Sequence, residues 1–481
     1  MKKLNLLILS FLCLGIGTGK AQYKDIHDFN GISGAAPLGS LRINGKTMYG
    51  MTLDGGLHDS GCVFSIDTNG KRYKDILDFN GVNGAFPEGS LTLFGKRLFG
   101  MTQIGGACYK GCIFMIDTDG NGYKDIFDFC GGTNGQNPVG NVTLSGKVLY
   151  GMTLYGGLNG MGNIFSIDTD GSGYKDLLDF NDTNGAYPYG SLTFSKGKLF
   201  GMTYQGGTIN NGCIFSIDTN GNGYRDLLNF NVSDGGLPFG SLILSGSKLF
   251  GMTDRNFSDG NIFTIDTDGT GYNVLFNFNG YDGYNPQGDV ILIGSNLYGM
   301  TLQGGASDSG VVFTVDTNGN NVRVLVDFNN NSYPEGANPV GDLTPSGNVL
   351  YGMTKLGGAN GYGVIFSYRN LGLGIDNLTS ISTSINVSPN PSHGIFTIRF
   401  NHSENARPDE SFGRVSGVEI YNVMGERVLK QILRSTQPAR TGTGGDDKTI
   451  DLSGQPNGVY FYRVLREDGS VLGSGKVVVE K

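Results

Sequence analysis

The sequence predicts an all-β protein: a seven-bladed β-propeller of four-stranded blades, followed by a small C-terminal β-sandwich. Three observations lead to this fold class. Each repeat interval contains four short runs of aromatic and β-branched residues separated by turn residues, which is the content of one propeller blade. The repeat stops near residue 370, where a different pattern of strands begins. The repeat itself is marked by the tripeptide Gly-Met-Thr, which starts at Gly50, Gly100, Gly151, Gly201, Gly251, Gly299 and Gly352.

The N-terminus has the three parts of a secretory signal peptide. Two lysines precede an apolar run at residues 4–16, and small residues lead to a predicted cleavage between Ala21 and Gln22. The apolar run is short for a membrane span, so we expect residues 1–21 to be removed and no transmembrane segment to remain. This removal takes away three lysines and no acid, which changes the formal charge from −8 to −11. So acidic a chain disfavours nucleic acid and anionic membranes as partners.

The two ends of the repeat region predict how the ring closes. The second copy has strand-like runs at 89–93, 97–102, 112–117 and 123–129. A run of the fourth type also appears at Tyr23–Phe29, before the first Gly-Met-Thr, whereas the last copy ends after Val364–Tyr368 without one. We therefore expect Tyr23–Phe29 to complete the last blade of a propeller spanning residues 22–370. An open β-solenoid is the alternative.

Two motifs connect the repeat to a known family. Gly-Met-Thr-x-x-Gly-Gly is followed by a strand of the form Gly-x-Ile-Phe-Ser-Ile-Asp-Thr, as at Gly212–Thr219. Over residues 22–370 the chain resembles the GloVer tandem repeats of extracellular bacterial proteins, which carry assorted C-terminal anchors. The resemblance implies no catalytic activity.

A second domain follows a Ser/Thr-rich linker at residues 371–386. Residues 387–481 contain alternating strand segments, including Gly394–Ile398, Val418–Asn422 and Gly458–Val464, and end in Gly475-Lys476-Val477-Val478-Val479. Their order resembles the C-terminal sorting domain of type IX secretion in Bacteroidota, an Ig-like β-sandwich. The resemblance implies engagement with the type IX machinery, and secretion or attachment at the outer cell surface. A sandwich with a binding role of its own is the alternative.

Five cysteines remain after signal cleavage. Cys62, Cys112 and Cys213 share a repeat position that Val311 and Val364 fill in other copies, so this position is expected to be small and semi-buried. Cys130 is expected across a hairpin from Cys112, with Cys108 close by. We predict one disulfide that uses Cys130, with Cys112 as its partner.

The hairpin turns raise the question of calcium. Asp117, Asp119 and Asn121 stand at positions 1, 3 and 5 before a glycine, and Asp168 and Asp170 repeat the pattern. Other copies replace these oxygens, and turns stabilised by Asp or Asn side chains explain the same residues. The favoured interpretation is a structural turn without a cofactor, and calcium is the alternative.

The sequence contains few of the side chains that catalysis usually requires. The chain has four histidines, and no arrangement of nucleophile and base stands out. A pair of carboxylates acting as in glycosidases stays open, because separations cannot be read from sequence. A polysaccharide-acting hydrolase or lyase on the same propeller is therefore the alternative to a binding protein, and a structural surface protein is a third.

Binding is expected on the face that carries the long loops. A motif repeated in every copy is scaffold, whereas differences between copies over a rigid scaffold indicate a binding surface. We predict a monomeric, non-enzymatic protein that binds an extracellular glycan or protein there. The alternative for the aromatic side chains is that they cover blade junctions. The candidate ligand-binding residues are His58, Asp59, Phe86, Tyr109, Tyr187, Tyr189, Phe239, Arg255 and Tyr284.

Overall fold

The computed structural model describes residues 22–231, 233–254, 260–329, 335–369, 384–401, 415–422, 427–432, 448–466 and 471–481. The predicted cleavage after Ala21, the linker up to residue 383 and Arg255 lie outside these residues. The chain divides into two compact units, Met1–Leu373 and Gly374–Lys481. In the described residues both units are built from β-strands, with one short 3-10 helix at Gly132–Asn134.

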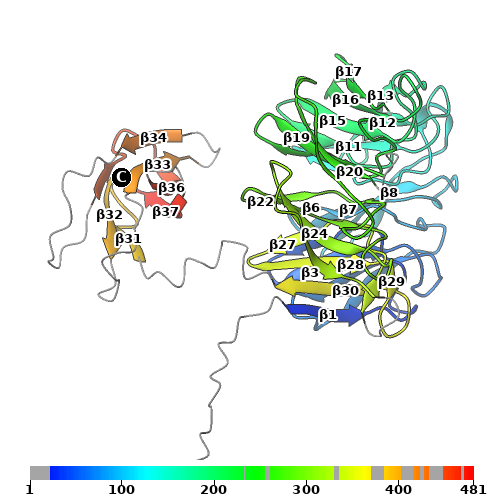
Figure 1. Cartoon of the computed structure of the whole chain (residues 1–481), viewed down its shortest axis with the longest axis horizontal. Coiled ribbons are helices and arrows are strands. Elements are labelled where there is room, and N and C mark those ends of the chain that lie inside the picture. The colour runs from blue at the N-terminus through cyan, green and yellow to red at the C-terminus, as the bar shows by residue number, and fades with distance from the viewer. Residues whose placement is uncertain are drawn as a thin grey trace, which may run out of the picture. The chain divides into compact units, whose positions relative to one another are not determined.

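The first unit contains seven four-stranded antiparallel sheets among its described residues (Figure 1). Six of them are formed by consecutive strands, and a short pair, β26 (Gly336–Ala337) and β29 (Leu356–Gly357), accompanies the seventh. The six sheets are β2 (Arg42–Asn44), β3 (Thr47–Thr52), β4 (Cys62–Asp67) and β5 (Lys74–Asp78); β6 (Thr92–Phe94), β7 (Arg97–Thr102), β8 (Cys112–Asp117) and β9 (Lys124–Asp128); β10 (Thr143–Ser145), β11 (Val148–Thr153), β12 (Asn163–Asp168) and β13 (Lys175–Asp179); β14 (Thr193–Ser195), β15 (Lys198–Thr203), β16 (Cys213–Asp218) and β17 (Arg225–Asn229); β18 (Ile243–Ser245), β19 (Lys248–Thr253), β20 (Asn261–Asp266) and β21 (Asn273–Asn277); β22 (Ile291–Ile293), β23 (Asn296–Thr301), β24 (Val311–Asp316) and β25 (Arg323–Asp327).

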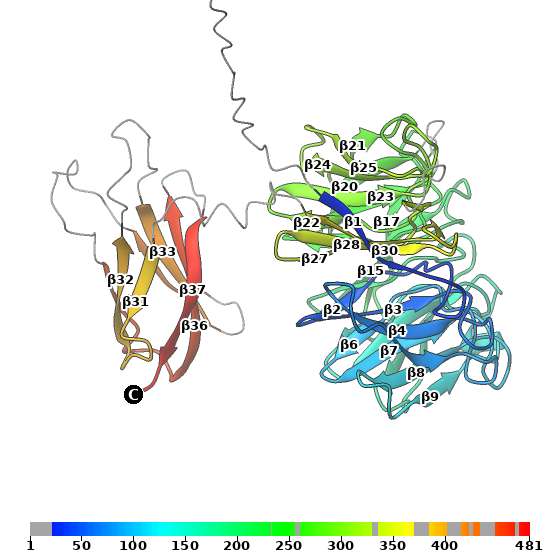
Figure 2. The same cartoon turned by 90° about the horizontal axis from the view of Figure 1, so that it is seen from below.

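The seventh sheet joins the two ends of the repeat region. Its strand order is β1 (Gln22–Asp28), β30 (Val364–Arg369), β28 (Val349–Thr354) and β27 (Thr344–Ser346). Gln22 pairs with Arg369 and Asp28 with Val364, and Figures 1 and 2 both draw β1 beside β30. The prediction that the N-terminal strand pairs with the last copy is therefore confirmed.

The Gly-Met-Thr tripeptide has a structural role at each of its positions. A Cβ atom on Gly201 would lie 2.5 Å from Cζ of Phe215, so only glycine leaves room for that buried ring. Met202 is buried in the apolar cluster that the sheet β14–β17 shares with the next one. The Thr203 hydroxyl accepts a hydrogen bond from the Cys213 backbone N–H and donates one to the Gln205 carbonyl. The repeated motif is scaffold, as expected.

Hydrogen bonds link neighbouring sheets in a cycle. In each link the backbone N–H of one residue donates to a side-chain oxygen of its counterpart in the next sheet, and the seventh link returns to the first residue. The residues follow one another in the order Ser40, Ser90, Asn141, Ser191, Ser241, Asp289, Asp342 and again Ser40. The first and last sheets are thus bonded to each other as the intermediate ones are.

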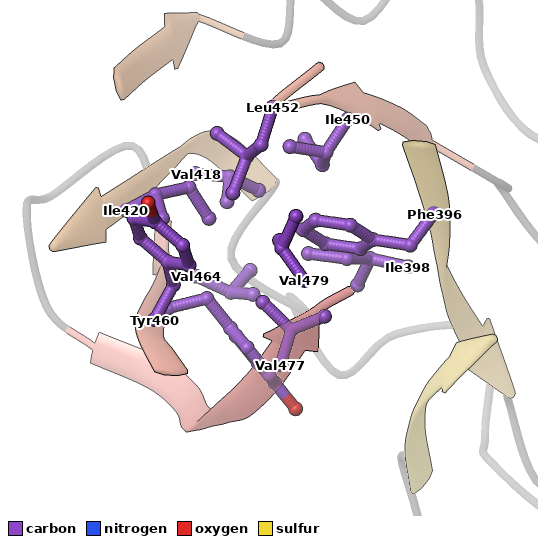
Figure 3. Close-up of a cluster of buried hydrophobic side chains, with 11 residues drawn as sticks. Phe396, Ile398, Val418, Ile420, Ile450, Leu452, Tyr460, Val464, Val477 and Val479 are labelled. Atoms are coloured by element: carbon purple, nitrogen blue, oxygen red, sulfur yellow. The ribbon is translucent and has the colours of Figure 1, made fainter. Parts of the chain in front are cut away.

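The second unit consists of two sheets around one apolar core. A three-stranded sheet has the order β31 (Ser384–Ser388), β32 (Ile395–Asn401), β35 (Lys448–Asp451), and a four-stranded sheet the order β34 (Arg427–Ile432), β33 (Val415–Tyr421), β36 (Gly458–Arg466), β37 (Val471–Val479). Figure 3 shows Phe396 and Ile398 of the first sheet facing Val464 and Val477 of the second. Among the described residues, no helix is both long and apolar enough to cross a membrane.

The disulfide prediction was wrong in one partner. Cys130 is bonded to Cys108, with 5.1 Å between their Cα atoms, and Cys112 is a buried free thiol. The Cys112 side chain is fully buried against the Thr102 hydroxyl, while Cys130 lies beyond the end of β9 and is bonded to Cys108 of a neighbouring loop.

Removing this disulfide is expected to lower the free energy of unfolding by about 3 kcal/mol, because a closed loop of this size restricts the unfolded chain. The comparison is C108S/C130S against the parent under oxidising conditions, by urea unfolding. Cys112→Val is the matched control, since Val311 fills the same place in another copy. Equal midpoints for the double variant and the parent would contradict the prediction.

Candidate functional site

The long segments of the repeat lie together at one end of the strands. The segment after β3 is hydrogen-bonded to the segment before β2: Ala35 N–H donates to the Asp54 carbonyl at 2.8 Å, and Asp54 N–H to the Ala35 carbonyl at 3.0 Å. The same bridge occurs between Ala85 and Ile104. These two loops therefore share one face, which is the long-loop face on which binding is expected.

A cavity of about 270 Å³ lies at this end of the sheets, next to the first strand of each sheet. It is surrounded by the segments that precede the first strands of all seven sheets of the first unit, and each segment contributes a glycine with the residue on either side of it. We call the seven residues that directly precede these glycines the inner ring. They are Leu38, Glu88, Val139, Tyr189, Phe239, Gln287 and Val340.

A second set of residues borders the inner ring. Each of them directly follows the threonine of a Gly-Met-Thr tripeptide, and Leu302 and Lys355 line the cavity themselves. We call this set the outer ring. It consists of Leu53, Gln103, Leu154, Tyr204, Asp254, Leu302 and Lys355.

Three aromatic side chains form one corner of the site. The rings of Tyr189 and Phe239 have centroids 4.7 Å apart, and the ring of Tyr204 lies 4.7 Å from Phe239 and 5.3 Å from Tyr189. Burial, with the neighbouring Tyr155, Glu88 and Tyr204, raises the pKa of the Tyr189 hydroxyl. This group therefore stays protonated, and the corner offers apolar ring surface with hydroxyl groups at its edge.

A carboxylate stands elsewhere on the inner ring. Burial raises the pKa of the Glu88 carboxyl, while the Lys355 ammonium and a hydrogen bond from the Gln103 side chain oppose that rise. Lys355 also lowers the pKa of Asp54, which burial and Asp59 raise. The cavity thus combines a carboxylate, an ammonium and amides with an aromatic corner.

Two further carboxylates lie where the cavity meets the cycle of hydrogen bonds between sheets. Burial and the nearby Asp342 carboxylate raise the pKa of Asp289 to about 7. The Ser241 N–H, which donates to Asp289, opposes this rise. Because the folded-state pKa lies above the unfolded value, the stability that Asp289 contributes is complete below about pH 4 and is lost as pH rises towards 7.

Asp289→Asn is expected to stabilise the protein by about 2 kcal/mol at pH 8 and to leave its stability unchanged at pH 4. The amide keeps an acceptor for the Ser241 N–H, as Asn141 does for Ser90, but carries no charge. Urea unfolding of parent and variant at both pH values measures the difference. The same gain at pH 4 and pH 8 would show that removal of the charge is not its cause.

The structure places two of the predicted ligand-binding residues, Tyr189 and Phe239, in the wall of the cavity. Tyr187 packs its ring edge-on against Tyr155 at 5.5 Å, and its backbone is left-handed, with φ 54°. Phe86 has the same conformation, with φ 53°. All seven residues before the loop prolines share this conformation, so it belongs to the scaffold of every copy.

Most other candidates lie away from the cavity. His58 and Asp59 are exposed, and the Asp59 carboxylate accepts a hydrogen bond from Gly55 N–H at 3.2 Å within its own loop. Tyr109 is 73% exposed at the equivalent loop tip. Tyr284 forms the backbone bridge to Gln303. Arg255 lies outside the described residues.

Sequence reasoning missed five residues of the site: Glu88, Gln103, Tyr204, Gln287 and Lys355. A usable signal was present, because each of them occupies one of two repeat positions that vary between copies beside nearly invariant neighbours. Aligning the copies on glycine and on Gly-Met-Thr would have found both rings.

The turns considered for calcium use their side chains locally. Asn121 N–H donates to Asp119 Oδ1 at 2.9 Å, and Ser172 N–H does the same to Asp170. The expected side-chain-stabilised turns are present. Within the described residues, no group of three or more His, Cys, Asp or Glu side chains is placed to hold a metal ion. The alternative of calcium at Asp117 or Asp168 stays untested.

Comparison with known families agrees with the repeat. The model of the Gloeobacter/Verrucomicrobia repeat matches residues 94–261 and 255–396, which together exceed half of the chain. The chain belongs to this repeat family. The model of the secretion system C-terminal sorting domain matches residues 386–480. This member of the family therefore carries a type IX sorting domain, which engages the type IX machinery and directs the protein to the outer cell surface.

Solved structures give distant matches to this family member. PorZ, a surface component of the type IX secretion system of Porphyromonas gingivalis, is 13% identical over 93% of this chain and 66% of its own, with a TM-score of 0.35. An oligogalacturonate lyase in complex with manganese is 11% identical over 73% of this chain and 93% of its own, with a TM-score of 0.45. No curated protein matches the chain.

Proposed function

We propose that the seven sheets are the blades of a closed propeller, and that the protein is a non-enzymatic binding protein of the outer cell surface. The cycle of hydrogen bonds from Ser40 through Asp342 and back to Ser40 supports the closed ring. The ligand is an extracellular glycan or protein, held at the face of the long loops.

One observation carries the proposed function. The inner-ring and outer-ring positions hold different side chains in different copies, although the glycines and threonines beside them are constant. Sevenfold repetition would by itself produce a symmetric cavity with no preferred ligand orientation. The differences give it an aromatic corner at Tyr189 and Phe239 and a charged side at Glu88 and Lys355, as expected of a specific binding site.

The experiment presents the mature chain, residues 22–481, to a glycan array and to extracellular proteins from the same cells. Every glycan that binds is then incubated with the protein and tested for shorter products. Binding without turnover supports the proposal. Turnover would show that the protein is an enzyme and would contradict the proposal. The absence of any partner would favour a structural surface protein.

A hydrolase or lyase is the second candidate, because carboxyl groups with raised pKa line the cavity. Glu88 and Asp289 are such groups, and a raised pKa is what a general acid needs near neutral pH. Asp289, however, is engaged as an acceptor for Ser241 N–H in the cycle between sheets. Glu88→Gln would abolish turnover if this candidate were correct.

A further inference from the structure

We infer that the cavity binds the terminal sugar of a glycan chain, an uncharged ring inserted end-on, rather than an internal stretch of the chain. This inference rests on the proposed binding function and names its ligand class. Its three supports are the size of the cavity, its position at one end of the inner strands, and the order of side chains around it.

The size fits one ring. At about 270 Å³ the cavity lies just below the range of roughly 300–1,000 Å³ that is typical of pockets for drug-sized ligands. A single hexose with its hydrogen-bonded water fills such a volume, whereas two linked hexoses exceed it. A longer glycan must therefore extend out of the cavity towards the long loops.

The wall of the cavity is formed where the backbones of neighbouring sheets meet. Each inner-ring residue is followed by a glycine, and a Cβ atom on that glycine would collide with the carbonyl oxygen of its counterpart in the next sheet. The contacts run from Gly39 to Gly89 and onwards, and Gly341 returns to Gly39. All residues that line the cavity belong to this end of the strands, and none of them comes from the tight turns at the other end. A glycan can therefore enter the cavity by one chain end from the long-loop face.

The order of side chains suits a polyhydroxylated ring. In the order set by the hydrogen bonds between sheets, Glu88 lies on the opposite side of the inner ring from Phe239 and Gln287. A sugar can place its C–H face on the aromatic corner while its hydroxyls donate to Glu88 and accept from Lys355 and Gln287. The cavity is lined by three carboxyl groups, Glu88, Asp289 and Asp342, and by one ammonium, Lys355, so an anionic sugar is disfavoured relative to a neutral one.

The test uses linear oligosaccharides of two to six hexoses in three forms: unmodified, blocked at the non-reducing end by methylation, and reduced at the other end to the alditol. They are chosen from the sugar types that bind the mature chain on the array. We expect one end modification to weaken binding at least tenfold and the other to have little effect. Affinity should change less than threefold with chain length, because one sugar makes most of the contacts.

The variants take their residues from other copies of the repeat. Tyr189→Val and Phe239→Val copy Val139 and Val340, and Glu88→Gln copies Gln287, so the fold should tolerate each. We expect each to weaken binding at least tenfold. Phe94→Ser lies in a tight turn at the opposite end of the strands and copies Ser145 of the next copy, so it is the control and should bind as the parent does.

Two results with glycans would overturn the inference while leaving the binding function intact. One is equal binding of the unmodified oligosaccharide and of both end-modified forms, and the other is unchanged binding by all three cavity variants. A protein that binds only polypeptide partners would also exclude the sugar. Failure to bind any glycan or protein would instead remove the proposed function together with the inference.

Discussion

Deletion of residues 22–29 from the mature chain is expected to abolish cooperative unfolding of the repeat unit. The deletion removes β1 and so leaves β30 with an unpaired edge. It also removes Phe29, which is fully buried in a cluster with Leu41, Phe64 and Ile365. An unpaired edge beside an exposed apolar cluster favours association between chains. We expect aggregation or a broad, non-cooperative urea transition by circular dichroism and light scattering.

The control moves the strand instead of removing it. In a variant that starts at residue 30, residues 22–29 are inserted after Arg369 through a turn copied from Thr118–Gly122. Every other sheet connects its third and fourth strands in this way, and Gln22 already pairs with Arg369. This variant should regain the sharp transition of the parent. If the simple deletion unfolded as sharply as the parent, β1 would not be needed to complete the unit.

Gly201→Ala is expected to lower the free energy of unfolding by about 3 kcal/mol or more. The added methyl would lie 2.5 Å from Phe215 Cζ and 3.1 Å from Leu192 Cδ2, and the Phe215 ring has no accessible surface. Neither side chain can move without disturbing the packing between two sheets. Urea unfolding of the mature chain measures the loss.

Two further variants test whether the clash with Phe215 is the cause of the loss. Gly246→Asn adds a larger side chain in a turn where no atom lies within 4 Å, at a φ of 65° that asparagine tolerates, so it should cost little. Combining Gly201→Ala with Phe215→Leu should recover part of the loss, because the smaller side chain makes room for the methyl. Additive losses in the double variant would refute a direct clash.

The architecture was predictable because its signals are local and repeated. The sevenfold Gly-Met-Thr spacing gave the sheets, and the displaced Tyr23–Phe29 segment gave the pairing of β1 with β30. The Cys108–Cys130 bond was not, since it depends on which side chain of a strand faces the core and on how one loop folds back.

The site was only partly predictable. Tyr189 and Phe239 stood out as aromatic residues after a loop proline, whereas Glu88 and Gln287 occupy the same position without standing out. The sequence pattern shows where a residue lies within its own copy, but it does not show which residues of different copies line the same cavity. Loop-tip residues such as His58 and Tyr109 look like contact residues for the same reason, although they lie outside the cavity.

The pairing of β1 with β30 also sets the order of folding. When the chain emerges N-terminus first, Lys24 must wait for Ser367, 343 residues later, before their hydrogen bond can form. Contacts that distant in sequence form slowly, because a long loop must close before they contribute any stability. The six sheets built from consecutive strands can form as soon as their strands have been exported. The seventh sheet cannot form until β30 has been exported, because β1 pairs with it. Until then β1 has no partner strand, and its unpaired edge is open to association with other chains.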